Sequence, residues 1–420
     1  MREDWNQRAR EDAHYYVAFG RRNQDGSEFF DTADEQVRGL ERELKRLPPM
    51  HWRSRRALEV GCGPGRLMRP LSRHFGEIHG VDISDEMVGL ARANLAGIPH
   101  AHAHYAPNSD LAAFADLSFD FVYSYAVFQH IPSREVVFGY LREAWRVLKP
   151  AGILRCQVNG LPAAARVYDT WSGVRISADE LRELAREVGF SMQALEGIGT
   201  QYMWTTMRKG PCWHRSTPVE PSIRRITNAQ NSEPVAPVAG PFSSIALWVQ
   251  GLPAEAGIDN LRVQINATDG LPCYLGPPEP DGMRQLNAYL PENLPTGLGR
   301  VELLFRDSPF CAAGNIRLIR PGPQVPRVTA LSDGIDLLSG TRIATRTLKA
   351  TVEEVERPEL LAATINGIDG ENLEWFRTDP RLPRHELNFH LPAAIGPGAA
   401  QVALTLGGRS LGVWGVEVLA

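Results

Sequence analysis

The sequence of 420 residues predicts an α/β domain built on a mainly parallel sheet, followed by two all-β sandwiches. Up to about residue 210, short apolar runs alternate with segments of helical periodicity, which is typical of a parallel sheet covered by helices. Beyond that point Pro and Gly recur about every ten residues and β-branched runs replace the helices. The C-terminal half also repeats itself after about 100 residues, which indicates two copies of one unit.

The first part of the chain is expected to hold seven strands. They lie at 57–60, 78–82, 101–105, 119–124, 153–158, 191–196 and 202–208. Helices are expected at 67–75, from Ser84, at 133–148, and from Ser177, where Ser177 and Glu180 form a capping box and Gly189 ends the helix. The last two strands follow each other directly, so they are expected to form an antiparallel edge. The pattern predicts a Rossmann-like, seven-stranded, mostly parallel sheet.

The repeat in the C-terminal half sets the remaining domain boundaries. Residues 285–291 (QLNAYLP) resemble residues 386–392 (ELNFHLP), and residues 261–266 resemble residues 361–366. Several short strands within about 100 residues are typical of an immunoglobulin-like β-sandwich. We therefore expect four segments: a catalytic domain at 1–210, a linker and first strand at 211–240, and sandwiches at 241–322 and 323–420.

Composition argues against several classes of protein. Charged residues make up 22% and apolar residues 43%, with a net charge of −4, so the chain is globular and lacks the basic face that nucleic acids require. Five scattered cysteines without a CxxC pair fit a reducing compartment. The charged N-terminus lacks a signal-peptide apolar region, and no apolar run is long enough to span a membrane. We expect a soluble cytoplasmic protein.

A glycine loop carries the strongest functional signal. It reads Glu59-Val-Gly61-Cys-Gly63-Pro-Gly65-Arg66 and joins a strand to a helix. The third glycine follows the first by four residues, whereas the dinucleotide pattern G-x-G-x-x-G has five, so an NAD-dependent oxidoreductase is disfavoured. Glu59 before the loop would repel a diphosphate and attract a cation, and Asp82 at the end of the next strand can accept ribose hydroxyls. A ligand with a ribose, a cationic centre and no phosphate is S-adenosylmethionine.

Four blocks in order resemble the class I S-adenosylmethionine-dependent methyltransferases of the type 11/25 kind. They are the glycine loop, Val81-Asp-Ile-Ser84 with Met87, Ser118-Phe-Asp120 with Ser124, and Arg146-Val-Leu-Lys-Pro-Ala-Gly152, and the resemblance covers about residues 50–208. It implies that the loop holds the amino-acid part of the cofactor and that Asp82 holds its ribose. The cofactor-binding residues so implied are Glu59, Gly61, Cys62, Gly63, Gly65, Asp82, Ile83, Met87, Asn108, Ser124 and Tyr15.

Some of these roles have alternatives. Ile83 and Met87 would flank the adenine, and Asn108 or Asp110 would meet its amino group, although the small–acidic pair usual in the family is not clearly present. Cys62 lies inside the loop, where a packing role is favoured over a nucleophilic one. Ser124 would pass beside the methionine and line the acceptor pocket.

Two further features concern the acceptor. His130 follows the fourth strand at the sheet edge where ligands bind, so it is the candidate general base; the alternative is a histidine that fixes the turn by a backbone hydrogen bond. The N-terminal helix carries Trp5, Arg8, Tyr15 and Tyr16, and the resemblance implies a lid over the cofactor. Packing of an amphipathic helix on the sheet is the equally supported alternative.

Other signals receive less weight. His100, His102 and His104 would share one face of a strand, but no Cys or acid completes a metal site, so none is expected. The sandwiches resemble IPT/TIG-like folds and could present a glycan, a lipid-linked saccharide or a protein for O- or N-methylation, or form a homodimer. The alternative is a cofactor-binding sensor or scaffold that acts through its immunoglobulin-like domains.

Overall fold

The computed structural model describes residues 1–18, 22–108, 110–163, 168–210, 220–240, 242–323, 325–335, 340–379 and 384–419. The chain forms two compact units. The first consists of residues 1–10 and 30–321, and the second of residues 11–29 and 322–420. Residues 211–219 of the expected linker lie outside the described residues. Within the described part, no helix is both long and apolar enough to cross a membrane.

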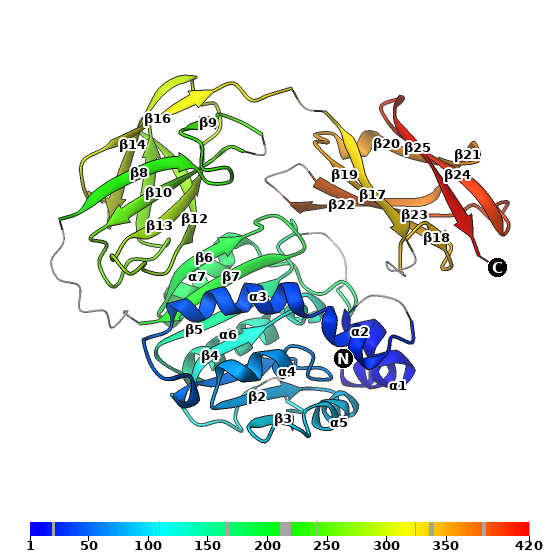
Figure 1. Ribbon diagram of the computed structural model, residues 1–420, viewed down its shortest axis with the longest axis horizontal. Helices are drawn as coiled ribbons and strands as arrows, with labels where there is room; N and C mark the ends of the chain where they lie inside the picture. Colours follow the sequence, from blue (N-terminus) through cyan, green and yellow to red (C-terminus); the bar gives the residue numbers. More distant parts are fainter. Residues whose placement is uncertain are drawn as a thin grey trace. The chain divides into compact units, whose positions relative to one another are not determined.

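The first unit contains the expected Rossmann-like sheet (Figure 1). Its strands are β1 (Arg56–Val60), β2 (Glu77–Asp82), β3 (Ala101–Tyr105), β4 (Phe119–Ser124), β5 (Leu148–Val158), β6 (Phe190–Glu196) and β7 (Met203–Lys209). They lie in the order β3-β2-β1-β4-β5-β7-β6. Strands β1 to β5 are parallel, and β7 runs antiparallel between β5 and β6. The predicted antiparallel edge is therefore confirmed.

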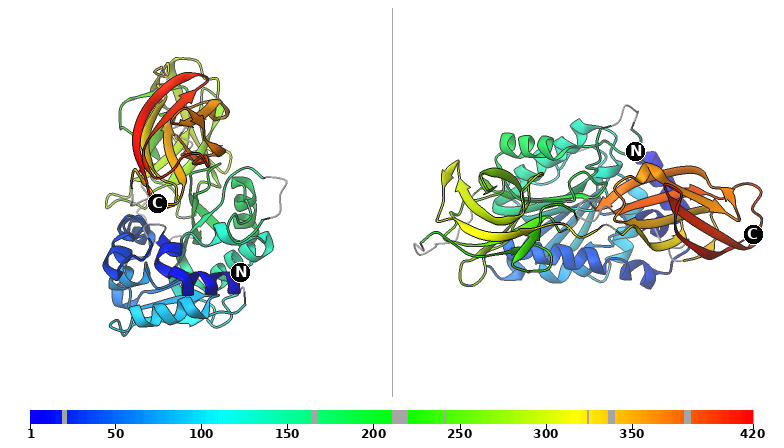
Figure 2. Two further views of the ribbon diagram at one scale, coloured as in Figure 1. Left: turned by 90° about the vertical axis from the view of Figure 1, so that its right-hand side faces the viewer. Right: turned by 90° about the horizontal axis from the view of Figure 1, so that it is seen from above.

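Helices cover both faces of this sheet (Figure 2). The helices of the chain are α1 (Arg2–Ala18), α2 (Gly26–Asp31), α3 (Asp34–Glu43), α4 (Met68–Leu71), α5 (Asp85–Asn94), α6 (Arg134–Val147) and α7 (Ala178–Val188). One apolar cluster joins α3, α4 and α5 to one side of the sheet, and another joins α6 and α7 to the other side. This is the arrangement that buries a parallel sheet on both faces.

Most helix ends lie where the sequence predicts them. Ser84, Ser133 and Ser177 accept hydrogen bonds from backbone N–H groups in the first turns of α5, α6 and α7, and Ser177 and Glu180 form the predicted capping box. Gly189 ends α7 with φ +94°, as a left-handed cap requires. The helix expected at 67–75 is shorter: α4 gives way to the 3₁₀ turn Ser72–His74. Its Pro70 has no backbone N–H to donate, which weakens the α-helical pattern there.

The rest of the first unit is all β. Its strands are β8 (Ser222–Asn228), β9 (Val235–Pro237), β10 (Ser244–Gln250), β11 (Leu261–Ile265), β12 (Thr268–Leu275), β13 (Arg284–Tyr289), β14 (Gly297–Phe305), β15 (Ser308–Pro309) and β16 (Gly314–Ile319). Strand β12 pairs with β6 where Tyr274 meets Ala194, so one sheet continues from the α/β part into the β part. The outer edge of β6 is thereby covered.

Buried polar side chains reinforce this joint. Gln193 Oε1 accepts hydrogen bonds from Arg208 Nη1 at 3.2 Å and from Arg284 Nη2 at 3.0 Å. Arg46 pairs with Glu43 at 2.6 Å and donates to the carbonyl of Leu275. Because a buried charge is costly unless it is paired and hydrogen-bonded, these contacts indicate that the two parts fold against each other.

The second unit repeats the β topology. Its strands are β17 (Arg327–Asp333), β18 (Arg342–Ile343), β19 (Thr347–Glu353), β20 (Leu361–Ile365), β21 (Ile368–Asp369), β22 (Glu371–Asp379), β23 (Arg384–His390), β24 (Gly398–Leu406) and β25 (Arg409–Val418). Strand β20 pairs with β24 as β11 pairs with β14, and β19 pairs with β23 as β10 pairs with β13. The internal repeat is confirmed, whereas the immunoglobulin-like class of the two copies stays a prediction.

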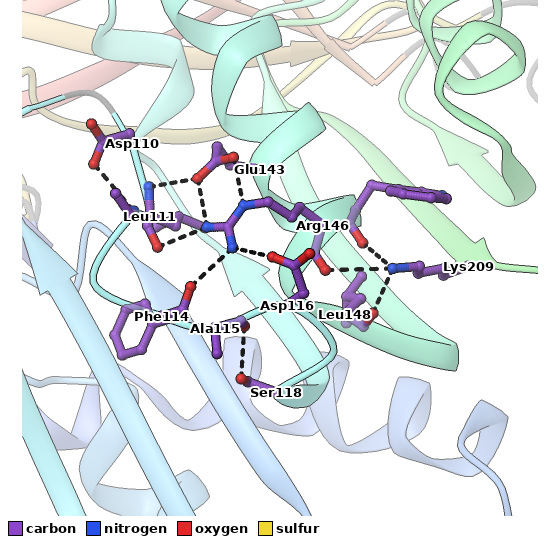
Figure 3. A network of polar contacts seen from close by, with 12 residues as sticks. Asp110, Leu111, Phe114, Ala115, Asp116, Ser118, Glu143, Arg146, Leu148 and Lys209 are labelled. Carbon is purple, nitrogen blue, oxygen red and sulfur yellow. Dashed lines mark hydrogen bonds and ion pairs between the residues drawn. The ribbon is translucent and has the colours of Figure 1, made fainter.

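The block at 146–152 supports the fold (Figure 3). Arg146 donates to the carbonyls of Leu111 and Phe114 and pairs with Asp116 and Glu143, which ties the loop before β4 to the end of α6. Lys209 Nζ donates to the carbonyls of residues 145, 146 and 148 and so satisfies the C-terminal end of the same helix.

A second anchor joins the starts of three strands. Asp120 of β4 is buried, pairs with Lys149 of β5 at 2.8 Å, and accepts a hydrogen bond from the backbone N–H of Arg56 in β1. The carboxylate therefore fixes the sheet at the end opposite the glycine loop.

Replacing Asp120 by Ala should leave the Lys149 ammonium without its partner and destabilise the first unit by about 2–4 kcal/mol. The matched control is Asp116→Ala, which removes an exposed partner of Arg146 and should cost less than about 1 kcal/mol. Chemical denaturation followed by tryptophan fluorescence measures both. Equal midpoints for the two variants would contradict the anchoring role of Asp120.

Candidate functional site

The end of β2 holds the glycine loop in place. The backbone N–H groups of Gly61 and Cys62 both donate to the carbonyl of Val81, at 2.8 and 3.0 Å. The N–H of Gly63 donates to Asp82 Oδ2 at 2.9 Å. The loop is therefore folded against the same strand end that presents the Asp82 carboxylate.

Glycine is required at Gly61 for two reasons. Its φ is +76°, a left-handed conformation that residues with a Cβ rarely adopt, and a Cβ there would lie 2.3 Å from the Val127 side chain. The Cys62 side chain lies against Gly80, and burial holds the pKa of its thiol well above the usual value. This is the kind of contact that a packing role for Cys62 requires.

Glu59 is a buried acid at the start of the loop. Its Oε2 accepts a hydrogen bond from the Tyr123 hydroxyl at 2.9 Å, and its residue is 3% exposed. Burial raises the pKa of Glu59 to about 8, while the Tyr123 hydrogen bond and the Arg66 charge act in the opposite direction. The group is thus largely protonated at neutral pH in the free protein, and a bound cation would draw off its proton.

Asp82 is held by two backbone donors. Its Oδ2 binds the N–H of Gly63 and its Oδ1 binds the N–H of Ser84, both at 2.9 Å. Burial raises its pKa, and the backbone hydrogen bonds oppose that shift. Because each carboxylate oxygen retains another lone pair, the group can also accept hydroxyl donors such as those of a ribose.

The residues expected to contact the adenine lie on both sides of the start of helix α5, which begins at Asp85. Met87 of α5 is 1% exposed and Ile83 is half-buried. Asn108 is exposed in the loop after β3, and Asp110 Oδ1 accepts the N–H of Ala112 at 3.2 Å. Neither Asn108 nor Asp110 gains a contact that favours one of them over the other as the adenine partner.

The Ser124 hydroxyl is buried and bonds to the strand that leads into the loop. Its hydroxyl donates to the carbonyl of Val60 at 2.8 Å, and it is 1% exposed. This contact joins the end of β4 to the last residue of β1, immediately before Gly61. Ser124 therefore supports the loop through the backbone.

Residues 1–10 contact the part of the site where the methyl donor is expected to bind. Ser84 Oγ donates to Asn6 Oδ1 at 2.6 Å, and Asn6 Nδ2 donates to Asp85 Oδ1 at 2.8 Å. The N-terminal helix is thus attached to the first turn of α5, beside Asp82.

Residues 1–10 also contact His130, where the methyl acceptor is expected to bind. The Trp5 ring meets the His130 ring edge-on at 5.6 Å, and Thr170 bridges Arg8 Nη2 and Asp4 Oδ2 at 3.3 and 3.0 Å. Helix α1 is kinked at Asp12, and Tyr15 and Tyr16 belong to the second unit. Of the expected lid residues, the first unit brings only Trp5 and Arg8 to His130.

His130 is fixed by long-range contacts. Its Nδ1 lies 3.2 Å from the carbonyl of Thr170, which can only accept, so Nδ1 carries the proton and Nε2 holds the lone pair. The amide nitrogen of Gln129 lies 3.4 Å from Nε2. Burial, with a smaller effect of Arg8, lowers the pKa of His130 to about 4, so the ring is neutral at physiological pH. The backbone contact is made to residue 170, across the site, and not within the local turn.

Gln129 presents a buried polar atom to the same region. The residue is 7% exposed, and its Oε1 has no hydrogen-bond partner among the described residues. Whichever way the amide is oriented, one of its two polar atoms faces His130 and the other is unsatisfied. A buried acceptor of this kind costs about 1–3 kcal/mol, which a ligand donor would recover.

The histidines of β3 form a different cluster from the expected one. His100 precedes the strand and its Nε2 lies 3.1 Å from the carbonyl of Ser72. His79 of β2 joins instead, with its Nδ1 3.0 Å from His104 Nε2 and its ring 5.1 Å from that of His102. Burial lowers the pKa of His79 to about 4. In the parts of the chain that are described, no group of three or more His, Cys, Asp or Glu could hold a metal ion.

Comparison with known proteins identifies the chemistry of this region. Residues 58–156 match a protein family described as methyltransferase domain. This part of the chain is similar to methyltransferase domains, and the similarity agrees with S-adenosylmethionine, the methyl donor expected from the glycine loop.

Two curated relatives illustrate the extent of the similarity. The chain is 32% identical to 24-methylenesterol C-methyltransferase 2 of Oryza sativa subsp. japonica over 155 residues, which is 33% of this chain and 41% of the relative. It is 28% identical to trans-aconitate 2-methyltransferase of Variovorax paradoxus over 214 residues, 46% of this chain and 78% of that enzyme. The chain thus spans about two fifths of the rice enzyme.

Solved structures give likenesses of low identity. Phosphoethanolamine N-methyltransferase 2 of Haemonchus contortus, with S-adenosylmethionine bound, is 19% identical with a TM-score of 0.35, over 42% of this chain and 52% of that one. Magnesium protoporphyrin IX methyltransferase from Synechocystis is 16% identical with a TM-score of 0.36, over 50% of this chain and 98% of that one.

The residues present fit this cofactor. Glu59 offers a buried carboxyl for an ammonium, Asp82 offers lone pairs for hydroxyls, and Gly61 leaves room for close backbone approach.

Sequence reasoning missed three residues of the site: Tyr123, Asn6 and Gln129. Tyr123 could have been found, because it pairs in register with Glu59 on the adjacent strand. Asn6 and Gln129 contact residues that lie far away in the sequence, so no local sequence pattern points to them.

Binding of S-adenosylhomocysteine at pH 7 should release close to one proton, because its ammonium favours the ionised form of Glu59 and lowers a pKa that stands at about 8 in the free protein. The affinity should rise between pH 6 and pH 8. Titration calorimetry in buffers of different ionisation enthalpy counts the protons.

Glu59→Gln should abolish the release and weaken binding about tenfold or more. Asp116→Asn is the matched control, because Asp116 is an exposed acid outside the expected cofactor site, and it should retain the release. Binding to the wild type without any transfer of protons to the buffer would contradict this role of Glu59.

Proposed function

We propose that the protein is an S-adenosylmethionine-dependent methyltransferase acting on an acceptor that offers a hydroxyl or amino group. The observation that carries the proposal is a pair of carboxyl groups, the buried Glu59 and the half-buried Asp82, on either side of a glycine loop that β2 holds in shape. A phosphate-bearing dinucleotide would meet two acids there, which disfavours NAD.

The cofactor supplies a methyl group that its sulfonium already activates, so the chain mainly positions two molecules and excludes water. Glu59 and the loop orient the amino-acid end, Asp82 orients the ribose, and Ile83 and Met87 contact the adenine. Asn6, Trp5 and Arg8 fasten the N-terminal segment over both sides of the site. Tyr15 and Asn108 remain candidate cofactor contacts.

The acceptor's chemistry is inferred from Gln129 and His130. The unsatisfied Oε1 of Gln129 suits a donor N–H or O–H, and neutral His130 has a lone pair on Nε2 that can take a proton. Both features favour O- or N-methylation. The two β repeats, proposed to be immunoglobulin-like modules of the IPT/TIG kind, would present a large acceptor such as a glycan, a lipid-linked saccharide or a protein, or would bring two copies together.

Direct titration tests the cofactor. The wild type should bind S-adenosylhomocysteine and not NAD, and Asp82→Ala should lower the affinity about tenfold to a hundredfold through loss of the ribose contacts. Asp116→Ala is the control, because Asp116 is an exposed acid outside the expected cofactor site. NAD binding without S-adenosylhomocysteine binding would refute the proposal.

His130→Ala should lower methyl transfer about a hundredfold or more without changing S-adenosylhomocysteine affinity, because a general base acts on the acceptor and not on the donor. Transfer of tritium from labelled S-adenosylmethionine into small-molecule, glycan and protein fractions of a cell extract measures turnover. His102→Ala, an exposed histidine of β3, is the control. Full turnover by His130→Ala would remove the base from the mechanism.

A further inference from the structure

The two β repeats differ in how the edge of one strand is used. Strand β12 of the first repeat pairs with β13 as β22 of the second repeat pairs with β23. The other edge of β12 is covered, because Tyr274 pairs with Ala194 of β6. Strand β22 is the last strand of its sheet and, among the described strands, pairs with β23 alone. Its outer row of backbone N–H and C=O groups therefore has no described strand beside it.

The internal repeat shows which residues of β12 and β22 correspond. Leu286 and Leu387 hold the same place in the repeated segments QLNAYLP and ELNFHLP. Leu286 lies opposite Leu275 in the β12–β13 pair. Leu387 lies opposite Trp375 in the β22–β23 pair. Leu275 and Trp375 therefore occupy equivalent positions.

These equivalent positions have opposite surroundings. Leu275 is fully buried, and its carbonyl accepts a hydrogen bond from Arg46. Trp375 is 44% exposed, although its side chain is the larger of the two. A large aromatic side chain next to an open strand edge is the combination that a docking strand covers, since the backbone supplies hydrogen bonds and the ring supplies apolar area.

Irregular backbone limits the open edge to a short segment. The register between β22 and β23 shifts between Glu371 and Glu374, and again between Arg377 and Asp379. Bulges of this kind interrupt pairing along an edge. The regular part is therefore 374–377, which contains Trp375 together with one acid and one base. Two copies of this segment do not repel each other, because Glu374 and Arg377 balance its charge.

We propose that the edge of β22 pairs with the same edge in a second copy of the chain. A two-fold axis makes an edge complementary to itself and sets the two strands antiparallel, which is also the direction in which β6 covers β12. Pairing within 374–377 brings the two Trp375 side chains together and buries them. The proposal rests on the part of the proposed function in which the β repeats bring two copies together, and it requires no particular methyl donor.

Sedimentation equilibrium of the full-length protein tests this contact. The weight-average mass of the wild type should rise with concentration toward twice the mass of one chain, below about 100 µM. Trp375→Lys should lower the association constant about tenfold or more, because the pairing would then place two ammonium groups side by side.

Val413→Lys is the matched control. Val413 of β25 is an apolar residue that is 58% exposed and lies in the other sheet of the same repeat, so this variant should associate like the wild type. If Trp375→Lys does not fold, Trp375→Thr replaces it: the strand propensity stays but the ring is lost, and association should weaken about threefold to tenfold.

The outcomes separate the contact from the proposed methyl transfer. A wild type that keeps the mass of one chain at every concentration would overturn the pairing of β22, and so would a folded Trp375→Lys variant that associates like the wild type. All of these proteins should bind S-adenosylhomocysteine equally. Failure of the wild type to bind it would refute the proposed methyl donor and would leave the contact between two copies standing.

Discussion

The carbonyl of Val81 and the carboxylate of Asp82 accept three successive N–H groups of the glycine loop. Without these bonds the loop would have left-handed glycines and unsatisfied donors but no single conformation. The same contact places Asp82, the acid proposed to bind the ribose, beside the loop, because its carboxylate is itself one of the acceptors. Ser124 completes the support from the other side through the carbonyl of Val60. The geometry of the donor site thus depends on strand order: β2 and β4 must both adjoin β1.

The sequence predicted what local patterns encode. The seven strands and the antiparallel edge followed from the apolar runs, and the serine caps and Gly189 marked helix ends that the structure has. Glu59 and Asp82 were predictable because their spacing from the glycines reflects one βαβ unit. The α4 boundary was wrong because Pro70 removes a backbone donor within the expected helix.

The remaining site residues could not be read from local patterns. Asn6 meets Ser84, and the backbone of Gln129 meets Gly173, only after the sheet has assembled. Periodicity also does not reveal the kink at Asp12, which interrupts α1 between Trp5 and Tyr15. The joint between β6 and β12 also rests on long-range partners, since Gln193, Arg208 and Arg284 are ordinary polar residues until they are buried together.

Burial and hydrogen bonding act in opposite directions on the two acids beside the glycine loop. Burial raises the pKa of Glu59 to about 8, and the hydrogen bond from the Tyr123 hydroxyl opposes that shift. Burial also raises the pKa of Asp82, and the backbone N–H groups of Gly63 and Ser84 oppose it. An ammonium beside Glu59 would draw off its proton and form an ion pair, whereas a ligand without a cation would leave Glu59 protonated. Selection for a ligand with a cationic end therefore follows from desolvation as much as from hydrogen bonding, because a buried carboxylate is costly until its opposite charge arrives.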